Sequence, residues 1–181
     1  MSSQPNQFSE IAAVDLGSNS FRLSIGRVAE QNGTKHIYQI DRLKETVRLA
    51  AGLDSAKMLN QESINRAIEV LHIFGDRLRT FHPDRVRAVA TNTFRVARNV
   101  ADFLPEAEAA LGFPIEVIAG REEARLIYLG VSHLLPDSDE RRLVVDIGGR
   151  STELILGQGH VAKTLESYRV GSVAWSIKHF P

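Results

Sequence analysis

A strand–turn–strand motif that occurs twice is the feature that most constrains the fold of this chain. Residues 13–26 read AVDLGSNSFRLSIG, and residues 144–157 read VVDIGGRSTELILG. When Asp15 is placed on Asp146, an offset of 146 − 15 = 131 residues, the identical pairs are Val14/Val145, Asp15/Asp146, Gly17/Gly148, Ser20/Ser151, Leu23/Leu154 and Gly26/Gly157. The shared aspartate, glycines and turn serine favour an internal duplication over a chance likeness between two hairpins. Two related units placed face to face would bring their turns to opposite walls of one cleft.

The pattern of apolar residues predicts an α/β fold built around a mixed sheet with flanking helices. Strand patterns occur at residues 11–16, 21–28, 36–43, 86–90 and 114–118, and helical spacing occurs at 60–81, 102–111 and 120–135. We expect Asn60 to cap the first helix and the basic segment 42–53 to be a loop. Three more strands within residues 143–167 and a helix from residue 171 repeat the beginning of this plan.

The polar stretch PDSDERR, residues 136–142, marks the predicted boundary between two units. A first lobe is therefore expected over residues 8–135. The start of a second lobe, which this chain leaves incomplete, is expected over residues 136–181.

Composition excludes several classes of function. Lys plus Arg equals Asp plus Glu at 22 each, which argues against nucleic acid or an anionic membrane surface as the main partner. The chain has no cysteine, so disulfides and thiolate metal sites are excluded. No apolar run approaches the roughly 18 residues of a membrane helix, and the polar start MSSQPNQFSE reads as a short lead-in rather than a signal peptide. A cytoplasmic protein without membrane insertion fits these features.

The two turns have the composition of phosphate-binding loops. Glycines let neighbouring backbone N–H groups point at one anion, and hydroxyl and amide side chains add donors. The candidate phosphate ligands are Gly17, Ser18, Asn19 and Ser20 in the first turn, and Gly148, Gly149, Arg150, Ser151 and Thr152 in the second. A carboxylate beside a phosphate repels it unless a divalent cation lies between them, so Asp15 and Asp146 are candidate Mg²⁺ ligands. The alternative is that each aspartate only caps its own turn.

Four segments together resemble one known family. AVDLGSNSFRL, TNTFRVARN, PIEVIAGREEARLIYLGV and LVVDIGGRSTEL, in this order, are similar to the exopolyphosphatase / guanosine pentaphosphate phosphatase family of the actin-like superfamily. The resemblance extends from about residue 8 to residue 181 and implies an actin-like, ribonuclease H-like fold. Family members usually have a third glycine where this chain has Arg150, and they continue well beyond the length of this chain.

The resemblance implies an enzyme that hydrolyses the terminal phosphoanhydride bond of inorganic polyphosphate, or removes the 5′-γ-phosphate of guanosine pentaphosphate. A glutamate then prepares the attacking water. Glu123 lies one turn before Ile127 on the apolar side of its helix, whereas Glu122 is rotated about 100° away, so Glu123 is the expected base. The alternative is that both acids only complement the helix dipole.

Two further residues are candidates for the same site. Glu153 alternates with Thr152 and Leu154, and it is either a metal- or water-positioning partner of Asp146 or a solvent-facing strand acid. Arg95 lies where a strand passes into a helix, where its guanidinium could hold a phosphate through two hydrogen bonds. A surface arginine is the alternative.

Arg150, which aligns with Asn19 at the turn tip, has two interpretations. Its guanidinium could grip phosphate, or its Cβ could crowd a position where glycine would adopt a positive φ, at about 1 kcal/mol. Arg42, Lys44 and Arg48 could extend a basic track for a long polyanion, or they could be a solvated basic loop.

Two alternatives to this enzyme remain open. One is a phosphate- or polyphosphate-binding module without catalysis, and the other is an actin-like phosphotransferase that uses ATP. The expected partner is polyphosphate or guanosine pentaphosphate, the expected cofactor is Mg²⁺, and pairing into a homodimer is left open.

Overall fold

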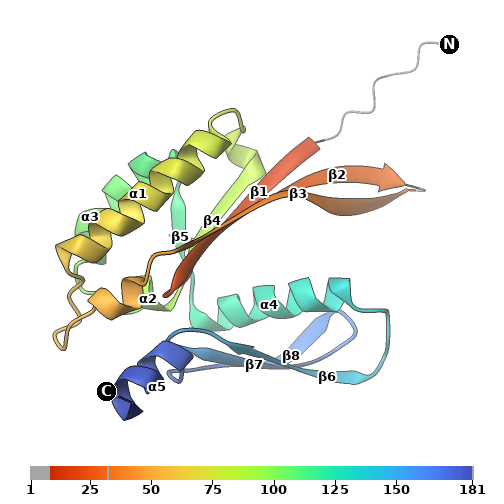
Figure 1. Cartoon of the computed structure of the whole chain (residues 1–181). Helices are drawn as coiled ribbons and strands as arrows, with labels where there is room; N and C mark the ends of the chain where they lie inside the picture. The colour runs from red at the N-terminus through yellow and green to blue at the C-terminus, as the bar shows by residue number, and fades with distance from the viewer. Residues whose placement is uncertain (1–8, 32, 181) are drawn as a thin grey trace.

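The computed structural model describes residues 9–31 and 33–180 (Figure 1). The predicted N-terminal lead-in therefore lies mostly outside the described residues. The first sheet has five strands in the order β3-β2-β1-β4-β5. Its strands are β1 (Ser9–Leu16), β2 (Ser20–Gln31), β3 (Thr34–Thr46), β4 (Val86–Ala90) and β5 (Ile115–Val117). Strands β1 to β3 pair antiparallel, and β4 and β5 join them in parallel, so the sheet is mixed as predicted.

The helices are α1 (Gln61–Leu78), α2 (Asn92–Val96), α3 (Val100–Leu111), α4 (Gly120–Leu134) and α5 (Ser172–His179), with short 3₁₀ turns at Leu49–Gly52 and Pro83–Arg85. A second sheet has the order β6-β7-β8, with β6 (Arg141–Ile147), β7 (Thr152–Gln158) and β8 (Val161–Tyr168) all antiparallel. The duplicated order of three strands and then helix is therefore confirmed.

Local signals in the sequence explain the limits of the longer helices. The side chain of Asn60 accepts a hydrogen bond of 2.9 Å from the backbone N–H of Ser63, which confirms the predicted cap of α1. Helix α3 ends at Gly112, which has a φ of 78° and thus the left-handed conformation that glycine adopts without strain. Both helices cover one face of the first sheet (Figure 1). The main apolar core lies between them and that face, around Leu16, Leu23 and Phe74.

Strand β3 is longer than the sequence pattern indicated. Residues 42–46, expected to belong to a basic loop, pair with β2 at Lys44↔Arg22 and Arg42↔Ser24. Leu43 packs on the core, so this stretch alternates between core-facing and outward-facing residues although most of it is charged. The loop prediction was wrong there and right only for residues after Thr46, where a 3₁₀ turn follows.

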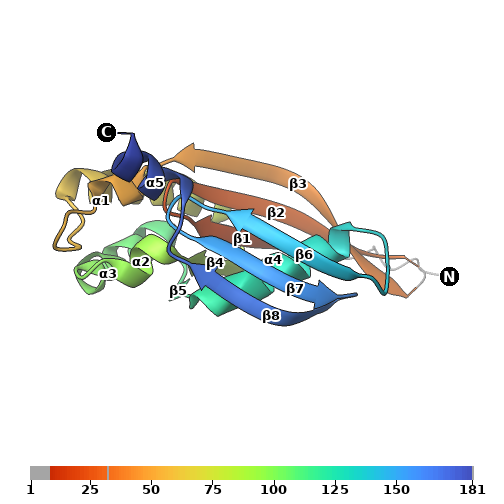
Figure 2. The same cartoon turned by 90° about the horizontal axis from the view of Figure 1, so that it is seen from below.

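Helix α4 packs against the second sheet rather than the first. Ala124 and Tyr128 form a small core with Ile155 of β7, and Val144 and Leu165 pack around it. In both cartoon views α4 lies between the two sheets (Figures 1 and 2). The predicted lobe boundary after residue 135 follows the order of the chain, but packing joins α4 to the strands that come after that boundary.

The outer face of the second sheet, turned away from α4, is apolar and open to solvent. Leu143 is 66% exposed and Ile147 is 68% exposed, and Val145 lies between them on the same face. Figure 2 looks onto this uncovered sheet. The face that carries α4 is the one that turns toward the first sheet.

Candidate functional site

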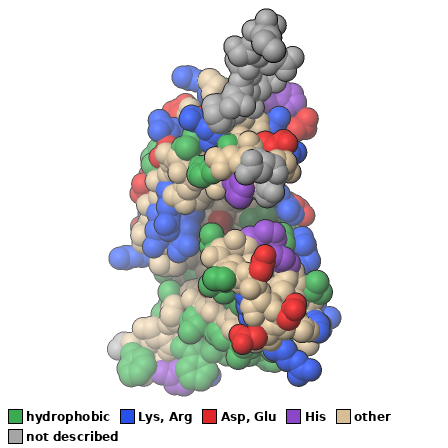
Figure 3. Space-filling model, turned by 90° about the vertical axis from the view of Figure 1, so that its right-hand side faces the viewer, with side chains coloured by type: hydrophobic (Ala, Val, Ile, Leu, Met, Phe, Trp, Pro, Cys, Tyr) green, Lys and Arg blue, Asp and Glu red, His purple; other side chains and the backbone are tan. Residues whose placement is uncertain are grey.

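The two homologous turns lie against each other where the two sheets converge. A Cβ built on Gly149 would lie 3.6 Å from the Cβ atoms of both Ser18 and Asn19. In each turn the first glycine has the same surroundings, because a Cβ on Gly17 would lie 3.0 Å from the carbonyl oxygen of Ser20, and one on Gly148 would lie 3.1 Å from that of Ser151. The duplication seen in sequence is thus a duplication of turn geometry. We call this junction of the two turns the cleft. Figure 3 views the opposite end of the molecule, which is hollowed between its upper and lower halves.

The carbonyl groups of the first turn are occupied by the segment that follows β3. The oxygen of Asn19 accepts hydrogen bonds from the backbone N–H groups of Val47 (3.0 Å) and Arg48 (2.8 Å). The oxygen of Ser18 accepts one from Ala50 at 2.8 Å.

The second turn is held in the same way by the start of α5. Gly148 accepts from Ser172 at 3.0 Å, and Gly149 accepts from Val173 at 2.9 Å and Ala174 at 3.1 Å. In both turns, the backbone carbonyl groups therefore accept hydrogen bonds from the segment that follows the third strand of the unit.

The backbone N–H groups at the turn tips remain available. In the part of the chain that the structure describes, no protein oxygen accepts from the N–H groups of Ser18, Asn19, Gly149 or Arg150. The buried hydroxyl of Thr93 donates to Ser18 Oγ at 2.8 Å and fixes the first turn against α2. Free amides with tied carbonyls are the arrangement that binds anions in backbone nests.

The two strand-end aspartates face the same cleft. Asp15 pairs across the sheet with Arg22, and Asp146 pairs in the equivalent register with Glu153, since 22 + 131 = 153. Although Asp15 is exposed to solvent, the surrounding protein partly desolvates its carboxyl group, and this raises its pKa. The charge of Arg22 lowers the same pKa, and the charge of Asp146 raises it further. The carboxylates of Asp15 and Asp146 are therefore close enough to repel each other.

Glu123 lies in the first turn of α4 and points into the cleft. Its carboxylate accepts a hydrogen bond of 2.8 Å from Arg95 Nη1, which also donates to the carbonyl oxygen of Ile118 at 2.8 Å. Burial is the largest cause that raises the pKa of Glu123 to about 7; the bond to Arg95 lowers it, while the charges of Glu153 and Asp15 raise it further.

The neighbouring Glu122 turns outward instead. It forms two hydrogen bonds with Arg125, at 2.7 and 2.8 Å, and these bonds lower its pKa. The orientation expected from the helix face is thus the observed one. The catalytic role of Glu123 stays a prediction.

Glu153 is buried, and its interpretation as a solvent-facing strand acid is wrong. Only 1% of its surface is exposed, and its carboxylate accepts a hydrogen bond of 2.8 Å from Ser167 Oγ on β8. The face of β7 that carries Glu153 is the one covered by α4, because Ile155 lies on the same face. The buried carboxylate therefore faces the start of α4, where its charge acts on Glu123.

Two arginines differ from the expectations. Arg150 is not among the described residues with a positive φ, so the interpretation that its Cβ crowds a glycine conformation is wrong. Its guanidinium donates to the carbonyl oxygen of Ala50 at 3.3 Å, which joins the second turn to the first lobe. Arg95 is engaged with Glu123 in this structure, so what it shows is a positioning contact, and a direct phosphate contact stays a prediction.

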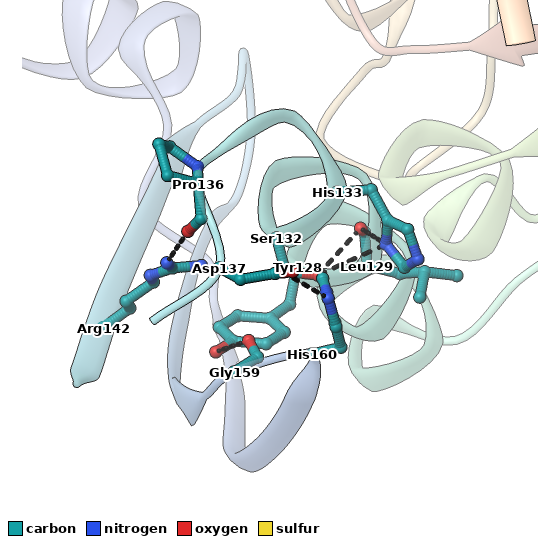
Figure 4. A network of polar contacts seen from close by, with 9 residues as sticks. All are labelled: Tyr128, Leu129, Ser132, His133, Pro136, Asp137, Arg142, Gly159 and His160. Atoms are coloured by element: carbon teal, nitrogen blue, oxygen red, sulfur yellow. Dashed lines mark hydrogen bonds and ion pairs between the residues drawn. The ribbon is translucent and has the colours of Figure 1, made fainter. Parts of the chain in front are cut away.

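A separate polar network lies at the other end of α4 (Figure 4). His160 contacts Ser132 Oγ through Nδ1 at 3.2 Å and Asp137 through Nε2 at 3.1 Å, and its ring lies 4.5 Å from that of His133. Ser132 is only 1% exposed, so this serine–histidine–aspartate set offers no accessible nucleophile. The network ties the α4–β6 connection to the β7–β8 turn, to which Tyr128 also donates a hydrogen bond at the Gly159 oxygen.

Two residues of the site, Arg22 and Ser167, were missed in the sequence. The hairpin register, in which Arg22 lies opposite Asp15, could have identified the first. No local signal identifies Ser167, because its contact with Glu153 depends on how β7 and β8 pair. Among the described residues, no group of three or more His, Cys, Asp or Glu side chains is arranged to hold a metal by itself. None of the described helices has the length and apolar character needed to cross a membrane.

The solved structures with similar folds include exopolyphosphatases and proteins related to them. An exopolyphosphatase-like protein is 33% identical with a TM-score of 0.82, and the match covers 96% of this chain and 54% of that one. The PPX-GPPA enzyme of Aquifex aeolicus is 32% identical with a TM-score of 0.77, over 96% of this chain and 56% of that one. An exopolyphosphatase from Cytophaga hutchinsonii is 27% identical with a TM-score of 0.84, over 95% of this chain and 54% of that one. This chain thus spans about half the length of these proteins.

The fold extends to more distant proteins. A PilM–PilN type IV pilus biogenesis complex matches with a TM-score of 0.58 at 14% identity, which shows a shared fold only. The fold is the actin-like one that was expected, with a mixed sheet and flanking helices. A model of the Ppx/GppA phosphatase family matches residues 25–181, which is most of the chain. The chain therefore belongs to the Ppx/GppA phosphatase family.

Proposed function

We propose that this protein is a phosphoanhydride hydrolase that releases the terminal phosphate of inorganic polyphosphate or guanosine pentaphosphate. The observation that carries the proposal is the meeting of two amide-rich turns beside Glu123, whose pKa is about 7. Membership of a phosphatase family supports a phosphate-containing substrate. A cytoplasmic location is part of the same proposal.

The chain's own residues account for binding and for water activation. The free N–H groups of Ser18, Asn19, Gly149 and Arg150 would hold the non-bridging oxygens of the terminal phosphates. Glu123 would accept a proton from water as the water oxygen bonds to the terminal phosphorus and the bridging P–O bond breaks, with the shortened chain as leaving group. Arg95 holds the Glu123 carboxylate, while burial and, to a smaller extent, the charge of Glu153 keep the pKa of that carboxylate high.

The proposed divalent cation fits the carboxylates that are present. Asp15 and Asp146 together supply two carboxylate ligands. Mg²⁺ is usually held by one or two carboxylates together with substrate phosphates. Their mutual repulsion is what a cation between them would relieve. When bound, Mg²⁺ would supply charge neutralisation of the phosphate oxygens.

A phosphate-release assay on the 181-residue chain tests the proposal. Long-chain polyphosphate, guanosine pentaphosphate and ATP are compared with and without Mg²⁺. The Glu123→Gln variant is expected to lose at least about 100-fold in rate while it still binds polyphosphate. Glu122→Gln is the matched control, because it changes an adjacent acid that points away from the cleft, and its rate should remain within about twofold of the wild type.

Wild-type rates in Glu123→Gln would show that this glutamate is not the base. Tight binding of polyphosphate without any release by the wild-type chain would select the binding-module alternative. Faster turnover of ATP than of polyphosphate would select an ATP-dependent phosphotransferase.

A further inference from the structure

Helix α2 holds the hydroxyl of Thr93 against the first turn. Phe94, the next residue, is 1% exposed and packs on Phe21, with 6.3 Å between the two ring centroids. Phe21 directly follows the first turn in the sequence. The carbonyl oxygen of Thr93 also accepts a hydrogen bond of 3.0 Å from the backbone N–H of Ala97. The core therefore fixes α2 beside the turn, and the Thr93 hydroxyl has little freedom to move away from it.

The Thr93 hydroxyl is the donor in its hydrogen bond with Ser18. A hydroxyl group has one proton to donate and two lone pairs that accept. Thr93 is 1% exposed, and among the described residues its Oγ1 has no hydrogen-bond partner besides Ser18 Oγ, at 2.8 Å. Because a buried hydroxyl proton without an acceptor costs free energy, the proton of Thr93 goes to Ser18.

Ser18 is then left with a proton of its own that the protein does not use. In the part of the chain that the structure describes, the bond from Thr93 is the one hydrogen bond of the Ser18 hydroxyl. Ser18 is 7% exposed, and a Cβ built on Gly149 would lie 3.6 Å from Ser18 Cβ. The unused O–H of Ser18 therefore lies where the two turns meet.

The second turn has no equivalent of this hydroxyl. The residue that corresponds to Ser18 is Gly149, since 18 + 131 = 149, and it offers only its backbone. The duplicated turns thus differ at one tip position, where the first unit adds a side-chain donor. A hydroxyl that donates to an ionised oxygen forms a stronger hydrogen bond than one that donates to a neutral group, so a phosphate oxygen is the acceptor that suits it.

We propose that Thr93 is a positioning residue for phosphate binding, because its hydroxyl donates to Ser18 Oγ and so directs the Ser18 proton to an oxygen of the bound phosphate. This inference rests on the proposed function and adds to it a residue that acts on the site from outside. Thr93 acts through Ser18 and does not touch the phosphate itself.

Binding of methylenediphosphonate, a diphosphate analogue with a carbon bridge that water does not cleave, tests the role of Thr93. Isothermal titration calorimetry on the 181-residue chain should show about fivefold weaker binding in Thr93→Val, because the Ser18 proton loses its fixed direction. Thr93→Ser keeps the hydroxyl and should bind within about twofold of the wild type. Ser132→Ala, which removes another buried hydroxyl at the far end of α4, is the control for destabilisation and should also bind within about twofold.

A double-mutant cycle with Ser18→Ala shows whether Thr93 acts through Ser18. The single Ser18→Ala change should weaken binding about tenfold and lower the melting temperature, because it leaves the buried proton of Thr93 without an acceptor. Adding Thr93→Val to Ser18→Ala should raise the melting temperature again and change the affinity by less than about twofold. Two independent residues would instead give the product of their separate losses.

Unchanged affinity in Thr93→Val, or a further fivefold loss when this change is added to Ser18→Ala, would overturn the inference while phosphate release by the wild type upholds the proposed function. A loss of affinity in Ser132→Ala as large as that in Thr93→Val would overturn it as well, since the loss would then reflect destabilisation. A wild-type chain that neither binds methylenediphosphonate nor releases phosphate would overturn the proposed function and this inference together.

Discussion

At the scale of single residues, Glu123 carries the clearest electrostatic signature in the molecule. Its carboxylate is largely buried, bonded to one arginine and surrounded by the charges of two other acids. These influences place its pKa at about 7, where a base is partly ionised at neutral pH and still binds a proton well.

The raised pKa of Glu123 predicts how activity and stability depend on pH. Phosphate release should increase as pH rises through about 7, because the ionised form is the base. Stability should change in the opposite direction: the folded state binds more protons than the unfolded state between pH 4.5 and about 7, so the free energy of unfolding falls as pH rises through this window. Urea titrations of the wild type and Glu123→Gln check this, since the variant should show a shallower slope, the remainder coming from other groups such as Asp15. Parallel slopes in the two proteins would contradict the assignment.

If Arg150 strained its turn, its replacement by glycine would raise the stability of the protein. The structure predicts the opposite. Because its φ is not positive and its guanidinium bonds to Ala50, Arg150→Gly should lower the stability, by about 1 kcal/mol, rather than raise it. Thermal unfolding measures this. A higher melting temperature for the glycine variant would show that the Arg150 side chain does not stabilise the fold.

Residue-scale prediction from sequence succeeded where one helix or one turn determined the answer. The direction of Glu123 follows from its place on the apolar stripe of α4, which the sequence shows directly. The bond between Arg95 and Glu123 joins residues 28 positions apart, and no periodicity relates them. Glu153 was ambiguous because both faces of β7 carry apolar residues, so alternation alone did not identify the buried face.

At the scale of elements, the start of α4 approaches β8 closely because of Gly120. A Cβ at this position would lie 2.6 Å from Ser167 Oγ and 2.7 Å from Ser167 Cβ. Gly120→Ala should therefore move the start of α4, which carries Glu123, and destabilise the fold by about 1–3 kcal/mol. Phosphate release should fall with it.

Gly130→Ala is the matched control in the same helix. Nothing lies within 4 Å of a Cβ at residue 130, and alanine is the better helix former, so this variant should be more stable by up to about 1 kcal/mol. Chemical denaturation of both variants gives the comparison. Equal effects at the two glycines would show that contact with Ser167 does not matter.

Element types and most element limits could be predicted, but their partners could not. The predicted cap at Asn60 was confirmed, and the end of α3 at Gly112, just after the predicted helix 102–111, is a local signal of the same kind. The apolar stripe of α4 shows that one side is buried without showing which sheet buries it. The charged end of β3 resembled a loop because its pairing with β2, not its composition, makes it a strand.

At the scale of the whole molecule, the two sheets and the elements packed on them meet through groups that repel as well as groups that attract. Asp15 and Asp146 raise the electrostatic cost of bringing the turns together, while Arg150 and Arg95 link segments across the junction. The duplication of the turn could be predicted from the sequence alone. The direct contact between the two turns could be found only in the three-dimensional structure, because it joins residues 18–19 to residue 149.

This balance predicts how Mg²⁺ affects stability. At about ten times its dissociation constant, Mg²⁺ should raise the melting temperature of the wild type by about 3–6 °C, because it neutralises facing carboxylates. Asp15→Asn and Asp146→Asn should show a smaller shift and should start from a higher melting temperature without Mg²⁺. Differential scanning calorimetry with Mg²⁺ titration measures both, and an identical shift in Asp15→Asn would exclude that carboxylate as a ligand.

The uncovered apolar face of β6 to β8 has a consequence for the behaviour of this polypeptide in solution. Exposed leucine, valine and isoleucine side chains on this sheet form an apolar patch that favours association with other apolar surfaces. Strand β6 is an edge strand of the described sheet, so it adds unpaired backbone N–H and C=O groups beside the patch. Concentrated samples of the 181-residue chain should therefore scatter more light and bind hydrophobic dyes more strongly than a closed globule of this size. Assays at low protein concentration are the appropriate condition for reading its chemistry.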